Sequence, residues 1–134
     1  MKLERTNYSS GAPLEDKVGS SRMVKVGPFI SIGGTTSVLP DGSVYGEGSA
    51  YEQTKYILQK SVGLLAQAGA AACDVVKIKG YLTDMAYASE AGRAFSEIFG
   101  DIRPLLTFVG TPMLNRPSQL IEIEMEAIAA SEAE

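Results

Sequence analysis

Three glutamates near the end of the chain carry the clearest chemical pattern in the sequence. Between Leu120 and Ala130 the chain reads LIEIEMEAIAA, so apolar residues alternate with Glu122, Glu124 and Glu126. A period of two is typical of a β-strand with one buried face, and it spaces the carboxylates about 6.6–7 Å apart on the other face. Such a row of like charges requires an opposing cation or open water. It is typical of an edge strand that resists sheet-to-sheet pairing, or of a pocket where a carboxylate positions a nucleophilic water.

The sequence contains no histidine, and this absence narrows the chemistry. It excludes serine–histidine and cysteine–histidine nucleophiles, the common zinc sites and the usual general base. Any catalysis must therefore use carboxylates, hydroxyls, lysine, arginine, tyrosine or backbone groups. The single cysteine, Cys73, begins an apolar stretch, and we interpret it as a small buried side chain and not as a nucleophile.

Length and composition predict one cytoplasmic globular domain spanning residues 1–134. A net charge of −4 without a lysine or arginine cluster argues against a nucleic-acid partner. The sequence has no apolar run of about 18 residues and no signal-peptide core, so we expect no membrane partner. One cysteine cannot form an intrachain disulfide, which favours a reducing compartment.

Hydrophobic periodicity predicts the elements that position the glutamate row. Gly27-Pro28 marks a hairpin, Ser49 and Glu52 form a capping box that opens a long helix, and Asp84 caps a second helix. The predicted helices end at Gly69 and Gly100, and the segment 9–13 is predicted to be a loop. The predicted strands cover residues 2–7, 21–26, 29–35, 75–83, 105–111 and 120–130.

The resulting order of elements, β-β-β-α-β-α-β-β, favours assembly of several copies. Two helices can cover only one face of a sheet of five or six strands. The other face still carries apolar residues on several strands, which a monomer would leave in water. We therefore expect a homo-oligomer that packs these faces together; the alternative is a monomer with an amphipathic outer face.

Several segments, taken in order, resemble the RidA/YjgF family of reactive-intermediate (enamine/imine) deaminases over nearly the whole chain. The matching segments read KVGSSRMVKVGPFISIGGTTS, LAQAGA, DVVKIKGYLTDM, FSEIFGDIRP and EIEMEAIA. The resemblance implies a chorismate-mutase-like α+β fold, with a mixed six-stranded sheet and two helices on one face. It further implies a homotrimeric barrel with small-molecule pockets between subunits, and no metal or organic cofactor.

The resemblance also implies a set of site residues, some of which this sequence lacks. Family members that hydrolyse 2-aminoacrylate-type imines hold the substrate carboxylate with an arginine in a P-x-R-S/T segment. Here that segment reads Pro104-Leu105-Leu106-Thr107, so Leu106 replaces the arginine before Thr107. Ser20 stands where a tyrosine is expected, and Gly33, before Gly34, where a serine is expected.

The water-holding glutamate of the family remains on the last strand as Glu124 or Glu122. Counting back from the EAIA segment that begins at Glu126 favours Glu124. Two arginines are available to replace the missing one. Arg103 belongs to a G-D-x-R-P run that a divergent subgroup without the arginine also has; otherwise it serves a surface or intersubunit salt bridge. Arg22 lies on the second strand, where an arginine is more often simply solvated.

The glycines before Thr35 offer backbone N–H groups to an anion, but no helix and no lysine follow at the offsets of a phosphate loop. We interpret the pair as a place where another group approaches the backbone closely.

Two functions follow from the sequence. The first is a cofactor-free hydrolytic deaminase of a small enamine, imine or related amino metabolite, with an altered substrate because Leu106 replaces the arginine. The second is a non-catalytic trimeric protein that binds a small molecule in the same clefts. A ribonuclease role, sometimes attached to this family, fits poorly with the acidic charge and the absence of histidine.

Overall fold

The computed structural model describes residues 2–129 and contains a mixed six-stranded sheet. The strands are arranged in the order β1-β2-β3-β6-β4-β5, and every neighbouring pair is antiparallel except β4 and β5, which run parallel. The predicted sheet is therefore confirmed. The strands are β1 (Arg5–Tyr8), β2 (Met23–Val26), β3 (Phe29–Thr35), β4 (Val75–Leu82), β5 (Leu105–Gly110) and β6 (Ile121–Ile128).

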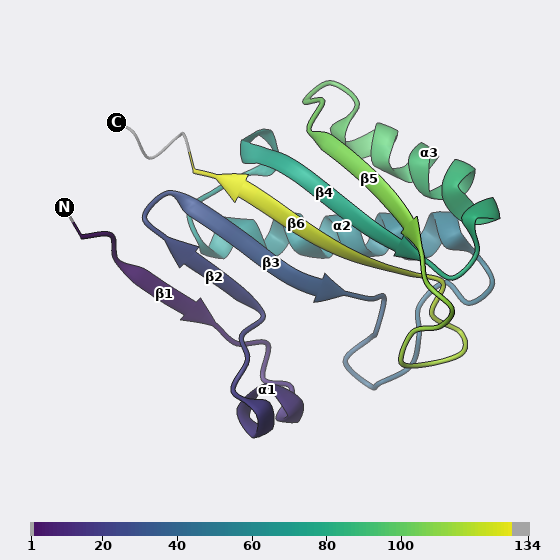
Figure 1. Ribbon diagram of the computed structural model, residues 1–134, viewed down its shortest axis with the longest axis horizontal. Helices are drawn as coiled ribbons and strands as arrows, with labels where there is room; N and C mark the ends of the chain where they lie inside the picture. The colour runs from purple at the N-terminus through teal and green to yellow at the C-terminus, as the bar shows by residue number, and fades with distance from the viewer. Residues whose placement is uncertain (1, 130–134) are drawn as a thin grey trace.

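Two long helices lie side by side behind one face of this sheet and leave the other face uncovered (Figure 1). This two-layer α+β arrangement was also predicted. None of the helices in residues 2–129 is long and apolar enough to cross a membrane. The α-helices are α1 (Pro13–Val18), α2 (Ala50–Gln67) and α3 (Ala88–Phe99), and the short 3₁₀ turns are η1 (Ala72–Asp74) and η2 (Met85–Tyr87).

The core lies between the sheet and the two long helices, because the alternation on β6 turns one side of that strand inward. Ile121, Ile123 and Met125 are buried, and the glutamates between them face the uncovered side. Apolar stripes on α2 and α3 complete the core; Leu58 and Phe99 are fully buried members.

Local signals set most of the element boundaries. The hydroxyl of Ser49 accepts a hydrogen bond from the backbone N–H of Glu52 at 3.1 Å and caps α2 as predicted. Gly27 adopts a positive φ of 58° and joins β2 to β3 in a two-residue turn. Asp84 caps the short turn η2 and not α3 itself, so α3 begins at Ala88, later than predicted.

Three features of the structure differ from what the sequence suggested. β6 is not an edge strand, because it lies between β3 and β4. The predicted loop is irregular as far as Ala12, but Pro13 begins the six-residue helix α1, which was not predicted. Cys73 is exposed and not buried: it lies in the short turn η1, where the neighbouring Asp74 is the buried residue and accepts a hydrogen bond from the backbone N–H of Ala71 at 2.9 Å.

Candidate functional site

Arg22 is held in place by both its backbone and its side chain. Its backbone N–H donates to the carbonyl oxygen of Tyr8 at 2.8 Å, and its own carbonyl oxygen accepts from the N–H of Gly33 at 3.0 Å. Its Nη2 donates to the carbonyl oxygen of Gly34 at 2.5 Å. Its Nε is buried and has no hydrogen-bond partner among the described residues. The guanidinium group is therefore fixed in position while part of its donor capacity is unused.

Gly33 and Gly34 form an irregularity in β3 that lets side chains lie against the backbone. The register between β3 and β6 shifts between Ile32 and Thr35. A Cβ on Gly34 would lie 2.5 Å from Oε2 of Glu122, and a Cβ on Gly33 would lie 2.8 Å from Nη2 of Arg22. Close approach to the backbone, as predicted for these glycines, is confirmed.

Glu122 lies over Gly34 and is half-buried. Burial raises the pKa of its carboxyl group; the positive charge of Arg22 opposes this shift, and the negative charge of Glu124 adds to it. Within residues 2–129 no ion pair joins Arg22 to Glu122. Glu122 is thus a carboxylate shifted toward the pKa range of a general acid or base.

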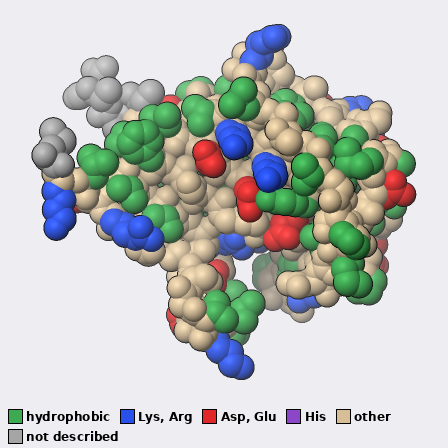
Figure 2. All heavy atoms as spheres, viewed as in Figure 1, with side chains coloured by type: hydrophobic (Ala, Val, Ile, Leu, Met, Phe, Trp, Pro, Cys, Tyr) green, Lys and Arg blue, Asp and Glu red, His purple; other side chains and the backbone are tan. Residues whose placement is uncertain are grey.

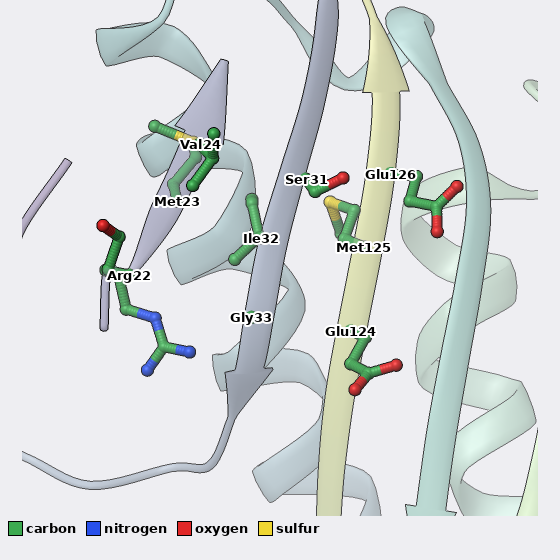
Figure 3. Close-up of a pocket in the computed structure, with 10 residues that line it drawn as sticks. Arg22, Met23, Val24, Ser31, Ile32, Gly33, Glu124, Met125 and Glu126 are labelled. Carbon is green, nitrogen blue, oxygen red and sulfur yellow. The ribbon is translucent and has the colours of Figure 1, made fainter. Parts of the chain in front are cut away.

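Glu124 lies two residues after Glu122 on the same face of β6 and is exposed. Its Oε1 accepts a hydrogen bond from the hydroxyl of Tyr81 at 3.1 Å, which leaves the other carboxylate oxygen for a water or ligand. Together with Arg22 and Gly33, Glu124 lines a hollow of about 300 Å³. Figure 3 shows the arginine and the glutamate on either side of the glycine.

Cations on the neighbouring strand relieve the repulsion within the glutamate row. In the β4–β6 register, Lys77 is opposite Glu126 and Lys79 is opposite Glu124, whereas Glu122 is opposite an uncharged tyrosine. Basic and acidic side chains accordingly lie close together near the middle of the uncovered face (Figure 2). Glu122 is the member of the row without a lysine opposite.

A second, larger cleft of about 1130 Å³ adjoins the first and shares Arg22 with it. It is bounded by α1, by the loops after β3 and β5, and by Tyr56 and Lys60 of α2, with Gly34 and Glu122 in its wall. Burial lowers the pKa of Lys60, and the charge of Arg22 lowers it further. Glu15 also lines the cleft, where the hydroxyl of Ser10 is the main cause that lowers the pKa of this carboxyl group.

The structure brings some of the predicted site residues together and leaves others apart. Arg22, Gly33, Gly34, Glu122 and Glu124 line the two hollows, and Ser20 lines the larger one.

The predicted residues of the arginine segment lie elsewhere. Leu106 and Thr107 are exposed on β5, an edge strand separated from β6 by β4. Arg103 is exposed in the turn after α3, with a positive φ of 62°. Neither hollow of the single chain contains any of these three residues.

Among the polar residues that sequence reasoning missed, Lys60 lines the larger cleft, and Tyr81 donates a hydrogen bond to Glu124 from outside both hollows. Lys60 carries no signal in the sequence, because it lies on the outer side of a helix beside the core stripe. Tyr81 had a usable signal: alternation places it on the same face of its strand as Lys77 and Lys79. Within residues 2–129 no three carboxylate or cysteine side chains are grouped so that they could hold a metal ion.

Comparisons with known proteins define the class of this fold. Residues 13–130 match the model of the family described as Endoribonuclease L-PSP. A RutC family protein from Pyrococcus abyssi is 36% identical over 112 residues, which cover 84% of this chain and 86% of that protein. An uncharacterized protein from Streptomyces coelicolor is 32% identical over 118 residues, covering 88% and 87% of the two chains.

Solved structures agree with the sequence matches. The crystal structure of a member of the YjgF/YER057c/UK114 family from Mycobacterium tuberculosis matches with a TM-score of 0.83 and 36% identity. The match covers 93% of this chain and 99% of that one. The chain belongs to the YjgF/RidA family, as its resemblance predicted.

Proposed function

We propose that this protein is a cofactor-free hydrolase that deaminates a small imine or enamine in pockets between the subunits of a homotrimer. The observation that supports it is the position of Arg22, which shares one hollow with Glu124 and the adjoining cleft with Glu122. A cation that binds an acid group and a carboxylate that holds water are the two groups such a hydrolysis needs.

In the proposed reaction Arg22 binds the acid group of the substrate and Glu124 holds the attacking water. The water oxygen bonds to the imine carbon while Glu124 accepts a proton from the water. That proton passes to the nitrogen and gives a carbinolamine. Glu124 then takes the proton of the carbinolamine hydroxyl and returns it to the nitrogen as the carbon–nitrogen bond breaks, so the products are a ketone and ammonia. An enamine substrate first gains a proton at carbon and loses one from nitrogen to become the imine. Tyr81 orients the carboxylate of Glu124 through Oε1.

Assembly into trimers is part of the proposal, because the uncovered face of the sheet is partly apolar. Phe29 and Ile128 form a cross-strand pair on this face and are 54% and 38% exposed. At the sheet edge Leu105 is 69% exposed. Covering such side chains would stabilise a complex of several copies.

The proposal is tested by Glu124→Gln and Glu122→Gln, with Glu126→Gln as the control: Glu126 borders the same hollow but lies opposite Lys77 and has no role in the proposed reaction. Hydrolysis of a panel of small imines should fall by about 10²-fold or more for Glu124→Gln, with the assembly unchanged in sedimentation. Glu126→Gln should keep activity. Wild-type turnover by both the Glu122 and the Glu124 variants would refute the catalytic role of this strand.

A non-catalytic small-molecule binding protein is the second candidate, and the presence of Leu106 in place of the family arginine favours it. In that case the wild-type protein should hydrolyse none of the imines but should still unfold at a higher temperature when a ligand is added. The ribonuclease activity named for the matching family fits the chain less well, because its net charge is −4 and it has no histidine.

A further inference from the structure

The larger cleft contains two cations from different elements. Arg22 enters from the start of β2, and Lys60 enters from the middle of α2. Within residues 2–129 neither side chain forms an ion pair with a carboxylate. The guanidinium is held by the carbonyl oxygen of Gly34, yet its buried Nε has no partner in that part of the chain. Two carboxylates, Glu15 and Glu122, also line the cleft, and the charge of Arg22 acts to lower the pKa of each, but within residues 2–129 neither forms an ion pair with Arg22 or Lys60.

In the described part of the chain, neither carboxylate of the cleft forms an ion pair with the two cations. The hydroxyl of Ser9 and the hydroxyl of Ser10 each donate a hydrogen bond to Glu15, and the N–H of Ser10 donates to its Oε1 at 3.0 Å, so this carboxylate keeps its charge but is held by the serines and not by a cation. Glu122 lies against Gly34, and its raised pKa shows that Arg22 does not fully compensate its burial. The charge of Arg22 also disfavours the charged form of Lys60, since it lowers the pKa of the lysine. An anion between the two cations would relieve that repulsion.

We propose that the larger cleft binds a doubly charged anionic group, as found in a phosphate monoester or a dicarboxylate, between Arg22 and Lys60. Two positive charges attract a dianion more strongly than they attract a ligand with a single carboxylate. The guanidinium is already held in position, so it loses little conformational freedom when the ligand binds. The cleft volume of about 1130 Å³ leaves room for a carbon body beside the anion, against Tyr56, Leu39 and Met113. The site rests on the proposed function in one respect, since Arg22 also binds the acid group in the proposed hydrolysis, but anion binding can be measured without turnover and so fails or succeeds separately.

The test is a calorimetric titration with inorganic phosphate, with malonate and with acetate, at constant ionic strength and without any imine. We expect saturable binding of phosphate or malonate and much weaker binding of acetate. Tighter phosphate binding would identify a phosphate monoester as the ligand group, and tighter malonate binding a dicarboxylate. Replacement of the cleft lysine, Lys60→Met, should weaken dianion binding by at least about tenfold, whereas Lys60→Arg should keep most of it.

Two further variants separate a direct contact from a general charge effect. Glu122→Gln removes a negative charge from the cleft wall and should strengthen dianion binding. Lys77→Met removes one positive charge from the uncovered sheet face, outside both hollows, and should leave binding unchanged. The amine of Lys60 should also titrate at a higher pH when phosphate is present, as followed by NMR. No saturable binding of either dianion, equal binding of acetate, or equal losses in Lys60→Met and Lys77→Met would overturn the proposal.

Discussion

Replacing Glu122 by glutamine should stabilise the protein near neutral pH and not in acid. Burial raises the pKa of Glu122 above its ordinary value of 4.5, so the folded state holds this proton more tightly than the unfolded state does. As pH rises through 4.5, the unfolded chain loses the proton first, and the stability of the fold falls until the folded-state pKa is passed. Glutamine has nearly the same shape as glutamate and carries no charge, so the stability of the variant should not fall in this way as the pH rises.

The size of the effect follows from the half-exposed position of the carboxylate. One unit of pKa shift corresponds to about 1.4 kcal/mol, but solvent screening of a group that is only partly covered reduces the net effect. We therefore expect Glu122→Gln to raise the free energy of unfolding by about 0.3–1 kcal/mol at a pH of about 8. At a pH of about 4 or lower, where wild-type Glu122 is largely protonated in both states, the gain should largely vanish.

Urea denaturation at both pH values, at one protein concentration and one salt concentration, measures this difference. Glu126→Gln is the control, because Glu126 is exposed on the same strand and lies opposite Lys77. Its free energy of unfolding should change by no more than about 0.5 kcal/mol. An equal gain for Glu122→Gln at both pH values, or no gain at the higher one, would show that the carboxylate is well hydrated and that the described environment of Glu122 is wrong.

The remaining predictions concern packing, assembly and the missing arginine. A Cβ on Gly80 would lie 2.7 Å from the ring of Phe108, so Gly80→Ala should destabilise the fold by about 1–3 kcal/mol in urea unfolding; unchanged stability would mean that the ring moves freely. Sedimentation at micromolar concentration should give a trimer, and a clear monomer would exclude pockets between subunits. Activity on 2-aminoacrylate should be weak or absent, since a bidentate arginine contact raises substrate affinity or reaction rate by about a hundredfold or more. Leu106→Arg should restore part of it, and robust wild-type activity would show that another cation already replaces the arginine.

Long periodic segments could be predicted from the sequence, and short ones could not. The capped helix α2 and the alternating strand β6 span enough residues for their periods to be recognised. Helix α1 has six residues, fewer than two turns, so no apolar stripe can mark it. Asp84 has the side chain of a helix cap, yet it caps a single 3₁₀ turn first. A cap identifies where a turn begins, but not how far the turn extends.

The place of β6 in the sheet could not be read from β6 alone. Alternation shows that a strand has one buried face, and this holds for edge strands and central strands alike. The lysines of β4 offered the missing clue. Lys77 and Lys79 have the same spacing as Glu124 and Glu126, and the structure pairs them across the two strands. Matched charge rows of opposite sign therefore favour neighbouring strands over two separate solvent-facing edges.

The location of Arg22 sets limits on how it could replace the missing arginine. Arg22 precedes β2, whereas Leu106 lies on β5, four strand spacings away, or about 19 Å across one subunit. One small ligand cannot contact both within a single chain. In a pocket between subunits, the Leu106 position of one copy would supply an apolar wall, while Arg22 and Glu124 would come together from the other copy. A substrate held by Arg22 would then have to lie along the sheet, so that its acid group and its reacting carbon face the same subunit.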